Sequence, residues 1–180
     1  LEVRPGSGTF VVQPTFEFLR DTLDFLIRFN PSALIELAEA RQSIEVEIAG
    51  LAAERATAED NQRITAHLEA MERAAGQPEV YVEADIHFHE ALARAANNQI
   101  LELLLKSIRG TLREAISVLI KNHPTALQEA MKYHRQIAAA VRQHSPQDAR
   151  LAMRNHLNGV HPALQELEAE HLAPPPAGES

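Results

Sequence analysis

Four ionisable residues lie at positions of the sequence where a helix is expected to be apolar. Asp85 and His89 share the apolar face of one predicted helix, one turn apart, and His134 and His156 each lie in the middle of the apolar face of a later one. A buried carboxylate is costly unless it is paired or binds a metal, and a buried imidazole needs partners for both ring nitrogens. A divalent cation bound by all four side chains would meet these requirements.

Three imidazoles and one carboxylate form a ligand set that suits Zn²⁺, and the same set suits Ni²⁺, Mn²⁺ or Fe²⁺ because ligand type discriminates weakly among these ions. Another interpretation stays open for each residue. A single inward histidine is more often a hydrogen-bonded core residue than a ligand, and the spacing of Asp85 and His89 also suits an exposed pair on a helix surface. The convergence of three helices favours the metal site.

Arg41 also interrupts an apolar face, that of the segment predicted to be helical over 32–55. Two interpretations need no ligand: an ion pair with Glu45, four residues later, or an extended side chain whose guanidinium reaches the surface. The third is an anion receptor, because a guanidinium can bind a carboxylate through two parallel hydrogen bonds. A metal ion and an inward arginine in one helical bundle would form a site for a small organic acid.

Motifs of the common enzyme classes are missing from the sequence. It has no cysteine, which excludes thiolate nucleophiles, disulfides and cysteine zinc sites. It has no His-Glu-x-x-His and no glycine-rich phosphate loop, and its one Glu-x-x-His pair, Glu168 with His171, cannot build a di-iron bundle, which needs two. We therefore expect no enzyme. The alternatives are a hydrolase-like metalloenzyme that uses a metal-bound water, and a purely structural helical interaction module.

The elements that must position these residues are helices. Aromatic residues make up only 4% of the 180 residues, and residues that favour helices (Ala, Leu, Glu, Arg and Gln) dominate. Apolar residues recur at spacings of three and four, and prolines and capping residues divide the chain. The sequence predicts an all-α bundle of about six to seven helices, at 15–29, 32–55, 58–75, 79–96, 98–121, 125–143 and 147–169.

The first residues follow a different pattern. Residues 1–4 and 9–12 alternate in the manner of strands around Pro5-Gly6-Ser7-Gly8, which predicts a β-hairpin with a glycine-rich turn. Because a lone hairpin is marginally stable, we expect it to be the end of a small domain. An ordered arm that packs on the bundle is the alternative.

Charge and hydropathy restrict the partners. The chain has 17 Lys+Arg against 25 Asp+Glu, a formal net charge of −8, so bulk charge gives no reason for the main body to bind nucleic acid. No apolar run approaches the ~18 residues of a membrane-spanning helix, and the first residues lack the pattern of a signal peptide. We expect a cytoplasmic protein that does not contact membranes.

Several segments together resemble a known family. The first segment resembles the wing that closes the winged helix-turn-helix domain of GntR-type bacterial transcription regulators. The later ones, in their combination and order, resemble the FCD effector-binding domain of the FadR subfamily. The resemblance covers the chain from Leu1 to about Leu167. The matching segments are 1–11, 39–49, 85–89, 133–135 and 155–157.

The resemblance implies an antiparallel helical bundle that is part of a homodimeric transcriptional regulator. Many members of the family bind a divalent metal through one Asp and three His. Their effector is typically a small carboxylate, and its binding is expected to shift the dimer between two arrangements with different operator affinity. The positions that match the metal ligands are Asp85, His89, His134 and His156.

For the effector, the resemblance implies contact with an arginine of the first bundle helix, which matches Arg41. It also implies an asparagine in the turn before the fifth bundle helix, which matches Asn98. Asn97 replaces a glycine that is usual there, although asparagine tolerates the left-handed conformation. Arg109 and Arg113 are further candidates for the pocket.

The resemblance also suggests how the chain is organised. Arg4, Gly6 and Gly8 could contact DNA as part of a wing, but a wing alone does not read sequence, so operator recognition is expected from an N-terminal domain whose recognition helix this chain lacks. The expected units are a wing remnant over 1–13, the effector-binding domain over 14–170 and a disordered tail over 171–180.

Overall fold

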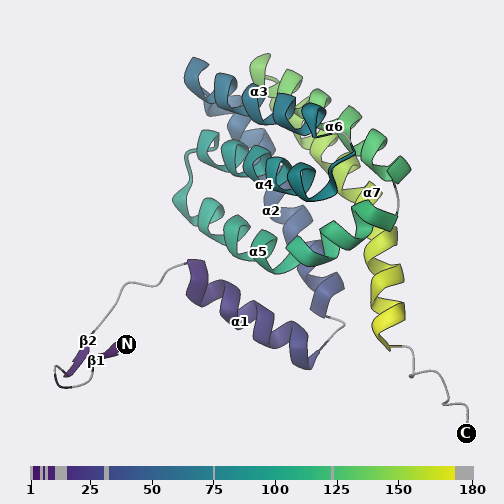
Figure 1. Ribbon diagram of the computed structural model, residues 1–180. Helices are drawn as coiled ribbons and strands as arrows, with labels where there is room; N and C mark the ends of the chain where they lie inside the picture. Colours follow the sequence, from purple (N-terminus) through teal and green to yellow (C-terminus); the bar gives the residue numbers. More distant parts are fainter. Residues whose placement is uncertain are drawn as a thin grey trace, which may run out of the picture.

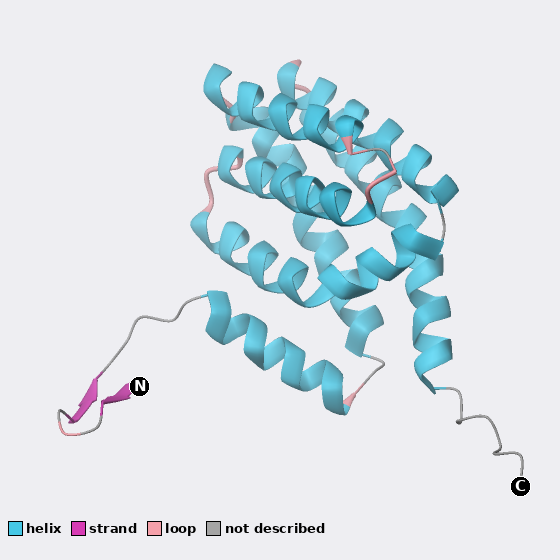
Figure 2. Cartoon of the chain, viewed as in Figure 1, coloured by secondary structure: helices cyan, strands magenta, loops and turns pink. Residues whose placement is uncertain are grey.

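The protein is an all-α bundle, as the sequence predicts. The structure is a computed structural model, and it describes residues 2–4, 6, 8–10, 16–30, 33–74, 76–122 and 124–172. Helices account for almost all of these residues (Figure 2). The described helices are α1 (Phe16–Phe29), α2 (Ala33–Arg55), α3 (Ala58–Arg73), α4 (Pro78–Ala95), α5 (Gln99–Asn122), α6 (Pro124–Arg142) and α7 (Pro146–Leu172).

Local sequence signals explain where several helices begin. Thr57 and Asp60 form a capping box at the start of α3, in which each side chain accepts a hydrogen bond from the backbone N–H of the other residue. Pro78, Pro124 and Pro146 are the first residues of α4, α6 and α7, positions where the missing N–H of proline is not needed. These residues fix where the later helices can start and therefore how the bundle folds back on itself.

Two non-glycine residues in the left-handed region separate consecutive helices. Asn97, with φ of 48°, lies between α4 and α5, and His144, with φ of 53°, lies between α6 and α7. Asparagine and histidine adopt this conformation more readily than most residues. Asn97 thus takes the conformation expected of a residue that replaces glycine.

The helices surround α4, which contributes two of the predicted ligands. Helix α4 packs against α2, α3 and α5, while α7 packs against both α2 and α6. Figure 1 shows α4 between α3 and α5, with α1 on the other side of α5. Side chains of α4 reach those of α6 and α7, since His89 Nε2 lies 3.3 Å from His134 Nε2 and the rings of His89 and His156 are 5.3 Å apart.

Alanine makes up an unusual part of the core. Twelve of the buried core residues in α2, α4, α6 and α7 and the turn after α4 are alanines, and such small side chains let helix backbones approach closely. They are Ala49, Ala52, Ala53, Ala84, Ala91, Ala93, Ala95, Ala96, Ala138, Ala140, Ala149 and Ala152. At Gly50 of α2, an added Cβ atom would overlap the guanidinium of Arg150 of α7.

Helix α1 has apolar residues on two sides. Leu23 and Ile27 pack against a small core cluster shared with α5. Phe18, Phe25 and Phe29 lie on the opposite side and are 69%, 64% and 71% exposed. One side of α1 therefore packs inside the chain, and the side that carries these phenylalanines is exposed.

The N-terminal residues form two short strands, β1 (Glu2–Arg4) and β2 (Gly8–Phe10), which pair antiparallel with Arg4 opposite Gly8. Gly6 and Gly8 have φ of 75° and 106°, a conformation that favours glycine. The interpretation of this hairpin as a wing stays a prediction. At the other end, residues 171 and 172 continue α7, and the rest of the predicted tail, 173–180, lies outside the described residues.

Among the helices that the structure describes, none combines the length and apolar character needed to span a membrane.

Candidate metal and effector site

Three helices bring the four predicted ligands to one buried point. Asp85 and His89 come from α4, His134 comes from α6 and His156 comes from α7. One ligand atom from each residue lies within 4.8 Å of all the others, and all four side chains are buried. The spatial convergence that the sequence analysis predicts is therefore present.

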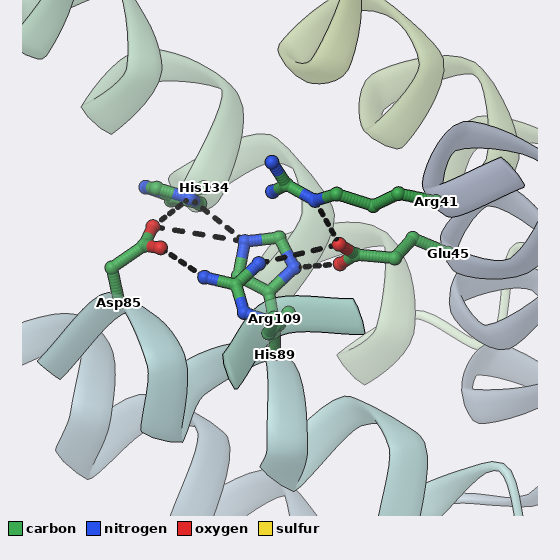
Figure 3. Close-up of polar contacts among 6 residues, drawn as sticks. All are labelled: Arg41, Glu45, Asp85, His89, Arg109 and His134. Carbon is green, nitrogen blue, oxygen red and sulfur yellow. Dashed lines mark hydrogen bonds and ion pairs between the residues drawn. The ribbon is translucent and has the colours of Figure 1, made fainter. Parts of the chain in front are cut away.

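The ligand atoms point at one another rather than at hydrocarbon. Asp85 Oδ1 lies 3.1 Å from His134 Nε2 and 3.7 Å from His89 Nε2. The two Nε2 atoms are themselves 3.3 Å apart (Figure 3). Two imidazole nitrogens that face each other can share at most one proton, whereas a cation accepts both lone pairs.

The histidines also leave polar atoms without partners. Nδ1 of His134 and Nδ1 of His156 are buried and have no hydrogen-bond partner among the described residues. Buried imidazole nitrogens are normally satisfied. Together with the mutual orientation of the four side chains, this means that the residues present fit a divalent cation with three nitrogen ligands and one oxygen ligand.

Electrostatics favours the protonation states that metal binding requires. Burial, supported by the nearby charge of Arg109, lowers the pKa of His89 to about 4. Burial also lowers the pKa of His156, and the charges of His134 and His89 act in the same direction. Burial by itself would raise the pKa of Asp85, but Arg109 and His89 hold it well below its usual range. At neutral pH these side chains are neutral imidazoles and a carboxylate, the forms that bind metal.

A second layer of charged residues surrounds the ligands. Glu45 of α2 accepts hydrogen bonds from Arg41 Nε at 2.5 Å and from Arg109 Nη1 at 3.2 Å, and its other oxygen contacts His89 Nδ1. Arg109 Nη2 donates to Asp85 Oδ2. The charges of Glu45 and Asp85 thus balance those of Arg41 and Arg109, and Figure 3 shows this network around His89.

Sequence reasoning treated Glu45 only as a possible partner of Arg41 and missed its contact with His89. The ion pair between Arg41 and Glu45 is present and buried. Arg41 is nevertheless close to the ligands, because Glu45 contacts both Arg41 Nε and His89 Nδ1. A signal was available in the sequence: Glu45 lies on the same apolar helix face as Arg41, and a carboxylate there also needs a partner.

The other predicted effector residues lie in different places. Arg109 is 1% exposed and belongs to the charged network, where both of its Nη groups already bind carboxylates. Arg113, one turn later, is 54% exposed and pairs with Glu83. Asn98 Oδ1 accepts hydrogen bonds from the backbone N–H groups of residues 100 and 101, so its side chain caps α5. The structure brings Arg109 to the site but not Arg113 or Asn98.

Aromatic side chains close the site from the side of α4. The ring of Phe88 is fully buried, with its centroid 5.0 Å from that of His134 and 5.5 Å from that of His89. Tyr81, one turn before Asp85 on α4, is also buried, and its hydroxyl has no hydrogen-bond partner among the described residues. The chain can therefore hold its ligands in a dry environment, where electrostatic interactions are strong.

The fold is thus an all-α bundle in which one carboxylate and three imidazoles meet at a buried point. The chain matches the FCD domain family over residues 36–159. A solved structure titled Streptococcus agalactiae GntR superposes with a TM-score of 0.69 at 29% identity, covering 90% of this chain and 74% of the other. The chain therefore belongs to the FCD-domain family of GntR-type transcriptional regulators.

Curated relatives agree with this assignment. The chain is 29% identical over 176 residues to the HTH-type transcriptional regulator LutR of Bacillus subtilis, which covers 96% of this chain and 80% of LutR. It is 33% identical over 172 residues to the Uxu operon transcriptional regulator of Escherichia coli, covering 92% of this chain and 66% of that protein. These relatives are named as regulators, which agrees with the expectation that the chain is not an enzyme.

Proposed function

We propose that this chain is the metal-dependent sensor of a small carboxylate in a DNA-binding transcriptional regulator. Asp85, His89, His134 and His156 would hold the ion, with Zn²⁺ the first candidate and Ni²⁺, Mn²⁺ or Fe²⁺ the others. The observation that carries the proposal is the convergence of four buried ligand atoms within 4.8 Å of one another. The ion would supply a Lewis-acid position for an oxygen of the effector.

Arg41 gives the site its second point of attachment. Its Nε donates to Glu45, and its two Nη groups would bind the carboxylate of the effector. Two further relatives in Escherichia coli are named for a galactonate operon and an L-lactate dehydrogenase operon, and galactonate and lactate are both hydroxycarboxylates. We infer an effector of the same chemical class, with one oxygen on the metal and its carboxylate against Arg41.

The metal is tested by its stoichiometry. Purified protein, stripped and then reloaded with Zn²⁺, is expected to bind one ion per chain, and His134→Ala is expected to abolish this binding. The matched control is His87→Ala, because His87 lies on α4 between two proposed ligands but is exposed on the surface. Full metal content in His134→Ala, measured by atomic emission, would end the proposal.

The effector site is tested by comparing two arginines. A thermal-shift and calorimetric screen of lactate, galactonate and small dicarboxylates on the Zn²⁺-loaded protein should find a ligand. Arg41→Ala is expected to weaken its binding by at least tenfold while the metal stays bound. Arg113→Ala is expected to leave the affinity unchanged, since Arg113 is exposed and pairs with Glu83. Unchanged affinity in Arg41→Ala would place the anion elsewhere.

The regulator is further proposed to act as a homodimer that binds operator DNA through an N-terminal winged-helix domain, of which the hairpin of β1 and β2 is the wing. The exposed Phe18, Phe25 and Phe29 of α1 support a dimer face, because contiguous exposed apolar residues mark interaction sites. Phe25→Glu is expected to weaken association in sedimentation equilibrium, while Ile100→Glu, at an exposed apolar residue of α5, is not. Equal effects of the two variants would rule out this face.

A further inference from the structure

Glu45 lies between the two halves of the proposed site. It is on α2, its side chain is 1% exposed, and it contacts groups from α2, α4 and α5. Its two oxygens have different partners: Oε1 accepts from Arg41 Nε and Arg109 Nη1, whereas Oε2 contacts His89 Nδ1. One carboxylate therefore holds both the arginine expected to bind the effector and a histidine expected to bind the metal.

We propose that Glu45 is a positioning residue that couples metal binding to effector binding. This inference rests on the proposed function and adds to it the route by which one ligand affects the other. Glu45 would not touch the metal or the effector, and it would act on each through one of its oxygens.

The contact with His89 determines which ring nitrogen of that histidine carries the proton and which one is left to bind the metal. An ionised carboxylate only accepts hydrogen bonds, so His89 Nδ1 carries the proton and donates it to Oε2. His89 Nε2 then keeps its lone pair, and this atom faces His134 Nε2 and Asp85 Oδ1. A carboxylate that binds the outer nitrogen of a ligating histidine fixes the ring and increases its basicity.

The contact with Arg41 connects the same carboxylate to the effector. An effector carboxylate that binds the Nη groups of Arg41 competes with Glu45 for the guanidinium charge and changes the position at which Glu45 is held. Because Glu45 is buried, its carboxylate cannot rotate out into solvent. A shift of Oε1 therefore also moves Oε2 and changes the contact of Oε2 with His89. Thermodynamic linkage then requires that the metal and the effector change each other's affinity by the same factor.

The alternative is that Glu45 serves only to neutralise the buried Arg41 and Arg109. Both roles predict that loss of the charge destabilises the fold, so stability alone does not separate them. They differ in two other quantities. Only the positioning role requires that the tautomer of His89 depends on Glu45, and only this role requires that the coupling factor between metal and carboxylate depends on it.

The experiment measures Zn²⁺ affinity by chelator competition, with and without saturating L-lactate, in the wild-type chain, Glu45→Gln and Glu47→Gln. Glu47 is the matched control, because it lies on the same helix but is exposed and pairs with Arg150. Glu45→Gln is expected to lose 10–100-fold in Zn²⁺ affinity, the usual effect of an outer partner of a ligating histidine. It is also expected to lose the effect of lactate on that affinity. Glu47→Gln is expected to behave as wild type.

A measurement on the wild-type chain does not depend on the variant folding. Nitrogen-15 NMR of labelled histidines should show the proton of His89 on Nδ1, both without metal and with Zn²⁺ bound. A proton on Nε2 in the metal-free chain would overturn the inference.

The outcomes separate this inference from the proposed function. If the wild-type chain binds no Zn²⁺, both fail. If it binds Zn²⁺ and lactate changes its affinity equally in wild type and Glu45→Gln, the proposed function stands and the coupling role of Glu45 is wrong. If it binds Zn²⁺ but lactate has no effect on wild type, the coupling is likewise refuted for this ligand class.

Discussion

Replacement of Arg109 by methionine should destabilise the metal-free protein far more than any surface arginine can. Arg109 is 1% exposed, and its guanidinium contacts two buried carboxylates, those of Asp85 and Glu45. Methionine fills a similar volume but carries no charge, so the variant leaves Asp85 without its arginine and Glu45 with one partner fewer. Removing one member of a buried ion pair typically costs about 3–5 kcal/mol.

That cost can be converted into a melting temperature. In a chain of this length, 1 kcal/mol shifts the melting temperature by roughly 2–4 °C, so Arg109→Met should melt some 6–20 °C below the wild type in the presence of a chelator. The matched control is Arg113→Met on the same helix, one turn later. Arg113 is 54% exposed and pairs with Glu83, and an exposed pair contributes about 0–1 kcal/mol. Its melting temperature should fall by roughly 4 °C at most.

The same variant separates the role of charge from that of packing. A divalent ion at Asp85 would replace the positive charge that methionine removes, so saturating Zn²⁺ should raise the melting temperature of Arg109→Met by more than it raises that of wild type. Differential scanning calorimetry with Zn²⁺ and with chelator measures both quantities. The reasoning is refuted if, without metal, Arg109→Met loses no more stability than Arg113→Met.

Two further predictions concern acid and the aromatic wall of the site. The pKa of His89 is about 4 in the folded chain and ordinarily near 6.5. Below pH 6.5, therefore, the unfolded chain binds a proton that the folded chain does not. The free energy of unfolding should then fall by about 1.4 kcal/mol per pH unit for this group, down to pH ~4. Asp85 and Glu45, whose pKa values are held low in the folded chain, extend the loss of stability as the pH falls further. Urea unfolding of the metal-free protein from pH 8 to pH 4 tests this prediction. A constant free energy of unfolding between pH 7 and pH 5 would contradict it. Phe88→Ala should lower the free energy of unfolding by about 3–5 kcal/mol because its ring is fully buried. The Zn²⁺ affinity should fall as well, because that ring packs on His134 and His89. Unchanged Zn²⁺ affinity in a folded variant would mean that the imidazoles are held without Phe88.

The sequence predicted the helices and the four proposed ligands because both follow from local periodicity. Asp85 and His89 lie on the apolar face of one helix, and such a position is informative whatever the neighbours are. The partners of Glu45 and Arg109 could not be assigned in this way. Their partners lie on other helices, 44 residues from Glu45 in the case of His89 and 24 residues from Arg109 in the case of Asp85, and no spacing along the chain encodes such distances.

Two sequence-based expectations were limited by the same lack of tertiary information. Arg109 and Arg113 are four residues apart and therefore share a face of α5, so periodicity alone gives no reason to separate the buried one from the exposed one. Helix α1 is apolar on two sides, and the sequence does not tell which side packs on α5. The structure places Leu23 and Ile27 there and leaves Phe25 outside.

The alanines between α2 and α7 have a mechanical consequence. A leucine or methionine interface can absorb a small displacement by changing rotamers, but alanine has no rotamers to change. At Gly50, the α2 backbone also lies directly against Arg150 of α7. A displacement of His156 therefore meets few side chains at these alanines that could absorb it, and we expect it to be carried along α7 toward the far end of that helix.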